Sequence, residues 1–153
     1  MTDCEILELE PQPTAVVRGD VPLAELSAFF GRAFASVFAV LGQQGVEPAG
    51  APFGLYAGMP ADTVPVEAGV AVSREIEPAD DVVPSRLPGG RVASAVHVGP
   101  YDTLEQTYAE LERWIAEQGL TSLPGPMWET YLTDPQAEPD PARWRTRVFQ
   151  PVR

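Results

Sequence analysis

Gly125-Pro126-Met127-Trp128-Glu129-Thr130-Tyr131 is a short strand-like stretch that holds one carboxylate among large side chains. It aligns without gaps on Gly50-Ala51-Pro52-Phe53-Gly54-Leu55-Tyr56, earlier in the chain. In both places a helical pattern that ends in glycine comes shortly before the strand. A supersecondary pattern that recurs within one chain indicates an internal duplication, so these two stretches decide the fold.

The first half is predicted to fold as β-α-β-β. Apolar residues spaced three and four apart predict a helix with Asp20 or Val21 near its cap, Pro22 in its first turn, and Gly42 and Gly45 at its end. Strands are expected on either side of it, near residues 5–10 with a resumption at 14–18, near 52–59 and near 66–74.

The second half repeats this order. A strand over 92–98 leads through a Gly-Pro turn to a helix that opens with the capping-box-like Asp102-Thr103-Leu104-Glu105 and stops at Gly119. Strands over 127–133 and 144–151 follow. Residues 77–90, rich in proline, glycine and acid, are interpreted as a linker.

We therefore predict one domain of the α+β class. It consists of a first repeat over about 4–76, the linker over about 77–90 and a second repeat over about 91–153. Neither repeat covers its own sheet alone, so a pseudo-twofold arrangement of duplicated β-α-β-β units is expected, with antiparallel sheets around a central ligand cleft.

The alternation of side chains along a strand selects the candidate ligand-binding residues. Met127, Glu129 and Tyr131 share one face of their strand, and Gly54 and Tyr56 share the equivalent face of the first copy. The opposite faces are more uniformly apolar and are expected to cover the helices. The set that contains Glu129 is then predicted to face the cleft, where the missing side chain of Gly54 leaves space.

A carboxylate removed from water is costly to ionise, so Glu129 is expected to have a raised pKa when no ligand is bound. At about 4 Å and an effective dielectric constant near 20, a cation would gain roughly 4 kcal/mol from it before desolvation. Each tyrosine or tryptophan face adds about 0.5–2 kcal/mol. One acid among aromatic rings therefore indicates a trap for flat, lipophilic cations, while a solvent-exposed edge position for Glu129 stays open.

The second half resembles a known family. Ala95-Val96-His97-Val98-Gly99-Pro100-Tyr101, with the residues named at the end of this paragraph, is similar to the GyrI-like small-molecule-binding domain, the effector-binding module of BmrR- and Rob-type transcription activators. The resemblance implies two β-α-β-β units around a cleft, with Glu129 as the buried acid that meets cationic ligands and Tyr56 and Tyr131 as pocket tyrosines. The further matching residues are Leu104, Tyr108, Leu111, Trp114, Gly119, Gly125, Pro126, Asp134 and Pro135.

Two further residues are candidates for the cleft. Tyr101 follows a turn and is a candidate lid, and His97 shares a face with Ala93 and Ala95 that could reach the ligand. A structural, hydrogen-bonded role for His97 is the alternative. A single histidine and a single cysteine, Cys4, argue against a metal site or a catalytic triad, and we expect no cofactor.

Charge and composition narrow the partners. A net charge of -12 repels phosphate backbones and anionic membranes. We therefore expect no direct contact with nucleic acid and no membrane association, since no apolar run approaches the roughly 18 residues of a span. One cysteine and no visible signal peptide fit the cytoplasm. The wide apolar face of the first helix leaves room for a homodimer or a protein partner.

Three functions are compatible with these features. The first is a stand-alone protein that captures lipophilic, often cationic or aromatic compounds. The second, known among stand-alone members of the family, is a hydrolase of electrophilic cyclopropane-type natural products, with Glu129 as the general base. The third is a protein-interaction module that modulates gyrase or antagonises a toxin. Binding is the favoured hypothesis.

Overall fold

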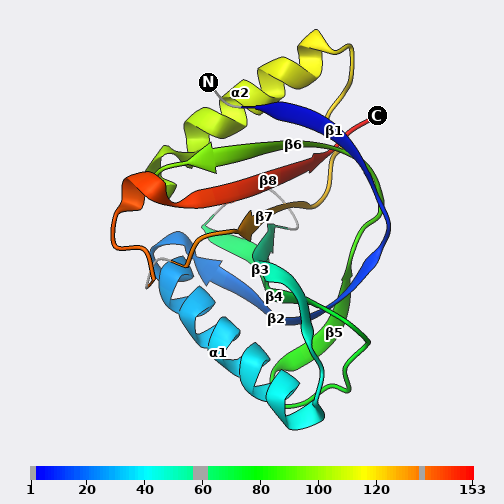
Figure 1. The fold of residues 1–153 in the computed structure, drawn as a ribbon, viewed down its shortest axis with the longest axis vertical. Coiled ribbons are helices and arrows are strands. Elements are labelled where there is room, and N and C mark those ends of the chain that lie inside the picture. Colours follow the sequence, from blue (N-terminus) through cyan, green and yellow to red (C-terminus); the bar gives the residue numbers. More distant parts are fainter. Residues whose placement is uncertain (1–2, 57–61, 135–136) are drawn as a thin grey trace. The chain divides into compact units, whose positions relative to one another are not determined.

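The computed structural model describes residues 3–56, 62–134 and 137–153, which form two compact units (Figure 1). The N-terminal unit consists of Glu10–Gly89. The C-terminal unit consists of Gly90–Arg153 together with the first strand of the chain, which ends at Leu9. The end of the strand expected near 52–59 and Pro135 of the family motif lie outside the described residues.

The N-terminal unit is a four-stranded antiparallel sheet with one long helix. The helix packs against β2 and β4, and its buried residues Phe29, Ala33 and Val37 join the strand residues in one core. The sheet order is β3-β4-β2-β5. The elements are β2 (Gln12–Pro22), η1 (Leu23–Glu25), α1 (Leu26–Gln44), β3 (Pro48–Tyr56), β4 (Thr63–Val72) and β5 (Val82–Leu87).

The C-terminal unit has the same build. Its helix α2 lies along β6 (Figure 1), and Leu111 and Ile115 of that helix pack with Ala93, Ala95 and Val148 of the sheet. The sheet order is β1-β6-β8-β7, all antiparallel. The elements are β1 (Cys4–Leu9), β6 (Gly90–Val98), η2 (Tyr101–Thr103), α2 (Leu104–Glu117), β7 (Met127–Tyr131), η3 (Pro141–Arg143) and β8 (Arg145–Pro151).

The predicted α+β fold with duplicated β-α-β-β units is confirmed. The series β2-α1-β3-β4 corresponds to β6-α2-β7-β8, and the sheet orders β3-β4-β2 and β7-β8-β6 are equivalent. Each unit then adds one edge strand next to its first strand, β5 in one unit and β1 in the other.

These edge strands correct two expectations. The segment 77–90 is not only a linker, because Val82–Leu87 forms β5 and pairs with β2. Pro84 is tolerated there because an edge strand needs hydrogen bonds on one side only. The strand expected near residues 5–10 begins earlier, at Cys4, whose side chain packs against the core under α2.

The helix starts also differ from the expectation. Strand β2 continues through Pro22, and a 3-10 turn leads into each helix. No side-chain cap bonds the start of α2, which has Thr103 at its N-cap, so the capping box at Asp102 is wrong. Helix α1 runs through Gly42 and ends before Gly45, which adopts a left-handed φ of 65° as predicted for a C-cap.

Within the described residues, the helical segment Leu23–Gln44 is long and apolar enough to cross a membrane by length and composition alone. The sequence expectation that no segment approaches this composition is therefore wrong. Helices that pack on a protein core and signal sequences near an N-terminus share this length and composition. In this chain α1 buries Phe29, Ala33, Val37, Val40 and Leu41 against its own sheet.

Gly69 lies where strands β4 and β2 of the N-terminal unit approach each other closely. It lies on β4 opposite Val16 of β2. A Cβ atom at this position would lie 1.9 Å from the carbonyl oxygen of Ala15. Strand β4 therefore requires glycine here, whereas Gly31 on α1 has open space where a side chain would be.

Candidate functional site

The register of β7 on β8 fixes the direction of the Glu129 side chain. Glu129 lies opposite Val148, and Tyr131 lies opposite Thr146. Val148 belongs to the core under α2, and directly opposed residues project to the same face of a sheet. Glu129 and Tyr131 therefore face helix α2.

This orientation corrects one step of the sequence interpretation. Residues were grouped correctly by alternation, but the face with Trp128 was assigned to the helix. Trp128 instead lies opposite Phe149 on the other face, and the two rings stack with centroids 5.4 Å apart. The more apolar face of β7 was assigned to the helix, and this was wrong because α2 presents polar groups, Thr107 and Tyr108, toward the sheet.

Glu129 is buried, with 6% of its surface exposed, and both of its carboxylate oxygens accept a hydrogen bond from a phenol. Tyr108 of α2 donates to Oε2. Tyr131, two residues along the same strand, donates to Oε1 at 3.1 Å. The alternative of a solvent-exposed edge position for Glu129 is thereby excluded.

Burial raises the pKa of the Glu129 carboxyl above its ordinary value. The hydrogen bonds from Tyr108 and Tyr131, and the nearby His97, act in the opposite direction and lower this pKa. Burial is the strongest of these influences, so the net direction is upward. The site therefore holds a carboxylate that gains from a positive charge brought next to it.

Two further aromatic rings, those of Tyr101 and Trp144, connect to this carboxylate through Tyr131. Tyr101 of η2 contacts Tyr131 edge to face, with ring centroids 5.9 Å apart, and lies 5.0 Å from the ring of Trp144. The Trp144 indole donates to the carbonyl of Glu138 at 2.8 Å, which fixes its position. Burial, then Glu129, then Asp134 raise the pKa of Tyr101, which is 38% exposed. Tyr101 thus forms the partly exposed side of the cluster.

His97 is buried, and both of its ring nitrogens are bonded to the chain. Nδ1 lies 2.6 Å from the hydroxyl of Thr107, and Nε2 lies 2.9 Å from the carbonyl of Pro100 and 3.0 Å from the hydroxyl of Thr103. These bonds tie β6 to the start of α2. They correspond to the structural role that the sequence analysis left open for this histidine.

The remaining candidates are less closely associated with Glu129. Met127 is the half-buried first residue of β7. Gly54 and Tyr56 belong to the N-terminal unit, where they lie opposite Ala68 and Val66 and so face α1. Their expected contact with a ligand stays a prediction.

The Glu129 cluster also contains three residues that were not selected from the sequence. Tyr108 bonds Glu129, Trp144 contacts Tyr101, and Thr146 lies opposite Tyr131. Tyr108 lies on the apolar stripe of α2 and was named only as a residue that matches the family. A tyrosine on such a stripe still needs a partner for its hydroxyl group, and an acid on the facing strand provides one. That requirement was the available signal. Trp144 and Thr146 gave no comparable signal.

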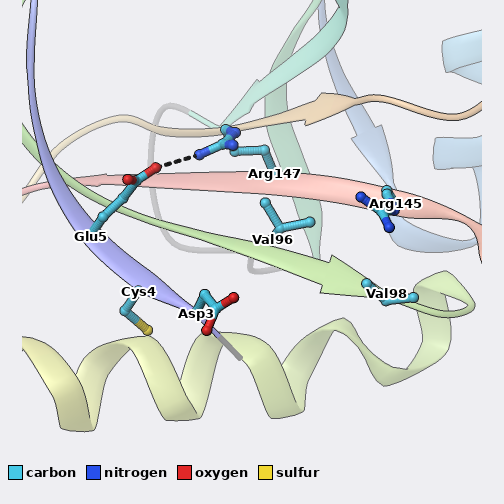
Figure 2. A pocket seen from close by; sticks show the side chains of 7 residues that line it. All are labelled: Asp3, Cys4, Glu5, Val96, Val98, Arg145 and Arg147. Carbon is cyan, nitrogen blue, oxygen red and sulfur yellow. Dashed lines mark hydrogen bonds and ion pairs between the residues drawn. The ribbon is translucent and has the colours of Figure 1, made fainter. Parts of the chain in front are cut away.

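A separate hollow of about 440 Å³ lies on the C-terminal unit, away from this cluster. Figure 2 shows Glu5 and Arg147 joined by an ion pair of 2.9 Å, with Arg145 and Val98 farther along the strands. Its lining holds two arginines and two acids, Asp3 and Glu5, and it shares no residue with the Glu129 cluster. Among the described residues, no group of three or more histidine, cysteine, aspartate or glutamate side chains is arranged to hold a metal ion.

Residues 2–153 match the family described as the GyrI-like small molecule binding domain. The search of curated proteins found no match. The solved structures described next are each below 25% identical to the chain, so their likeness shows the fold alone.

The EcmrR C-terminal domain superposes with a TM-score of 0.86 at 19% identity, covering 100% of this chain and 98% of that one. In the EcmrR–DNA complex the TM-score is 0.78 at 21% identity, and the match covers 99% of this chain but only 57% of EcmrR. SAV2435 bound to tetraphenylphosphonium gives 0.68 at 13% identity, over 99% and 94% of the two chains. A hydrolase from Listeria innocua gives 0.67 at 16% identity, over 99% and 92%.

Proposed function

The chain belongs to the GyrI-like small-molecule-binding domain family, and from that premise we propose that it binds lipophilic cationic compounds beside Glu129. The observation that carries the proposal is the buried carboxylate of Glu129, held on each oxygen by a tyrosine hydroxyl. Binding of small molecules follows from the family, whereas the cationic class of ligand rests on this geometry.

The electrostatics favour a cation over a neutral molecule of the same shape. The raised pKa of Glu129 means that its charge is poorly compensated in the free protein. A cation at about 4 Å would gain roughly 4 kcal/mol at an effective dielectric constant of 20, before its own desolvation. The rings of Tyr101, Tyr131 and Trp144 add cation–π contacts of about 0.5–2 kcal/mol each.

One relative of the same fold supports the class of ligand. SAV2435 has been solved with tetraphenylphosphonium, a lipophilic cation without hydrogen-bonding groups. Such a ligand relies on aromatic surface and on an opposite charge, which the Glu129 cluster offers. Met127, two residues before Glu129 on the same strand, is proposed to contribute a further contact to the ligand.

The test is to titrate the protein with tetraphenylphosphonium and with neutral triphenylphosphine oxide, using tryptophan fluorescence. Trp144, which contacts Tyr101, reports on the cluster. We expect the cation to bind at least tenfold more tightly, which is about 1.4 kcal/mol. Equal affinities, or binding of the neutral compound alone, would contradict the proposal.

A hydrolase is the second candidate, because a carboxylate with a raised pKa is suited to act as a general base near neutral pH. The Listeria innocua relative is named a hydrolase. Glu129 would take a proton from water as the water opens an electrophilic ring, and a tyrosine hydroxyl would polarise the electrophile. Ring-opened product formed from an electrophilic cyclopropane compound, and absent with Glu129→Gln, would decide for this activity.

A further inference from the structure

Thr146 belongs to the strand that lies between β6 and β7 in the C-terminal unit. It lies on β8, opposite His97 of β6 on one side and opposite Tyr131 of β7 on the other. The three side chains therefore form one row on the face toward α2. Thr146 is fully buried, with 0% of its surface exposed.

The hydroxyl of Thr146 has no hydrogen-bond partner within the part of the chain that the structure describes. Both of its neighbours in the row are bonded: Tyr131 donates to Glu129, and His97 is bonded to Thr107 and Pro100. A buried hydroxyl without a partner weakens the folded state, because it has given up its bonds to water. Valine has nearly the same shape without this disadvantage, and a hydrogen-bond partner from outside the chain would offset the cost of threonine here.

We propose that the Thr146 hydroxyl is a second binding point of the Glu129 site and hydrogen-bonds a polar atom of the ligand. The inference rests on the proposed function and makes it more specific. The Glu129 carboxylate lies next to the positive charge of the ligand, and the Thr146 hydroxyl forms a hydrogen bond with a hydroxyl or carbonyl group of the same molecule. Tyr131 neighbours each of these residues: it donates a hydrogen bond to Glu129 and lies directly opposite Thr146.

The register sets the spacing that a ligand must have. Glu129 lies opposite Val148, two residues along β8 from Thr146, so Glu129 and Thr146 are diagonal neighbours. Such neighbours have backbones roughly 7–8 Å apart. A cationic centre carrying an aromatic ring with a hydroxyl or carbonyl substituent spans this distance. The ligand class is therefore a lipophilic cation with one polar group on an aromatic ring.

The test compares two cations that differ by one hydroxyl group: tetraphenylphosphonium and (3-hydroxyphenyl)triphenylphosphonium. Their affinities are measured by calorimetry for the wild type, Thr146→Val and Thr146→Ser. Thr146→Val is expected to lose about 3- to 10-fold in affinity for the hydroxylated cation and less than twofold for the other. Thr146→Ser, which keeps the hydroxyl, should retain the preference.

A second measurement does not depend on ligand binding. If the hydroxyl is unpaired in the free protein, Thr146→Val raises the melting temperature by about 2–4 °C. Thr14→Val is the matched control, since Thr14 is the other buried side chain without a partner among the described residues and belongs to the N-terminal unit. It should raise the melting temperature similarly and leave both affinities unchanged.

The outcomes separate this inference from the function on which it rests. Wild-type protein that binds neither cation overturns the proposed function and the role of Thr146 together. If each cation binds Thr146→Val as tightly as it binds the wild type, only the proposed role of Thr146 is contradicted. A melting temperature that is unchanged or lowered in Thr146→Val means that the hydroxyl is already bonded, which also overturns it.

Discussion

The hydroxyl of Tyr108, on helix α2, donates a hydrogen bond to the carboxylate of Glu129, on strand β7. The two residues are 21 positions apart, and their bond joins helix α2 to strand β7 through a polar contact. Around it, α2 packs through apolar side chains such as Leu111 and Ile115. This bond therefore links the stability of the C-terminal unit to the charge state of its candidate ligand-binding residue.

Replacing Tyr108 by phenylalanine is expected to destabilise the protein by about 1–3 kcal/mol at pH 8, because a buried carboxylate then loses a donor. Tyr131→Phe is the matched control. Its hydrogen bond lowers the pKa of Glu129 less than the bond from Tyr108 does, so we expect a smaller loss. Urea denaturation of the three proteins measures both effects. A Tyr108→Phe variant as stable as the wild type would show that the bond has no energetic role.

The raised pKa of Glu129 gives stability a defined dependence on pH. The folded protein binds the Glu129 proton more tightly than the unfolded chain, whose glutamate has a pKa of about 4.3. This contribution therefore decreases as pH rises from that value through the raised folded value, and it is absent above both. Because Glu129→Gln cannot titrate, its stability relative to the wild type should increase over this window. Urea denaturation between pH 4 and pH 8 tests this, and parallel curves for the two proteins would refute it.

Two glycines offer a paired test of the packing. Gly69→Ala should destabilise the protein by more than about 3 kcal/mol, because its Cβ would meet the Ala15 carbonyl at 1.9 Å. Gly31→Ala, on α1 with nothing within 4 Å, should instead stabilise it by about 0.5–1 kcal/mol. Thermal unfolding of both variants is the measurement. Similar shifts for the two would mean that strand β4 does not approach β2 as described.

Much of the fold could be predicted because the two repeats share short sequence patterns. The match of Gly54 and Tyr56 with Glu129 and Tyr131 located equivalent strands, and glycines marked both helix ends. Of the two edge strands, the one near residues 5–10 was predicted without its pairing and β5 was missed, each for a physical reason. Strand β1 pairs with β6, far along the chain, and β5 contains a proline that an edge position tolerates.

The site was predicted only in part. Alternation grouped Glu129 with Tyr131 correctly, yet the choice of face depended on which helix covers it and with which side chains. That choice requires the pairing of Tyr108 with Glu129: the need of the Tyr108 hydroxyl for a partner was a signal, but the sequence does not say which acid provides it. The row of His97, Thr146 and Tyr131 depends likewise on the register of three strands, which only the structure provides.

The central claim is that Glu129 supplies the charge that holds a cationic ligand. Its most direct test is the affinity of wild type and Glu129→Gln for tetraphenylphosphonium and for triphenylphosphine oxide, measured by calorimetry at pH 8. The account predicts that the substitution lowers affinity for the cation at least tenfold and leaves affinity for the neutral compound within about twofold. Equal losses for both compounds, or no loss for the cation, would contradict it.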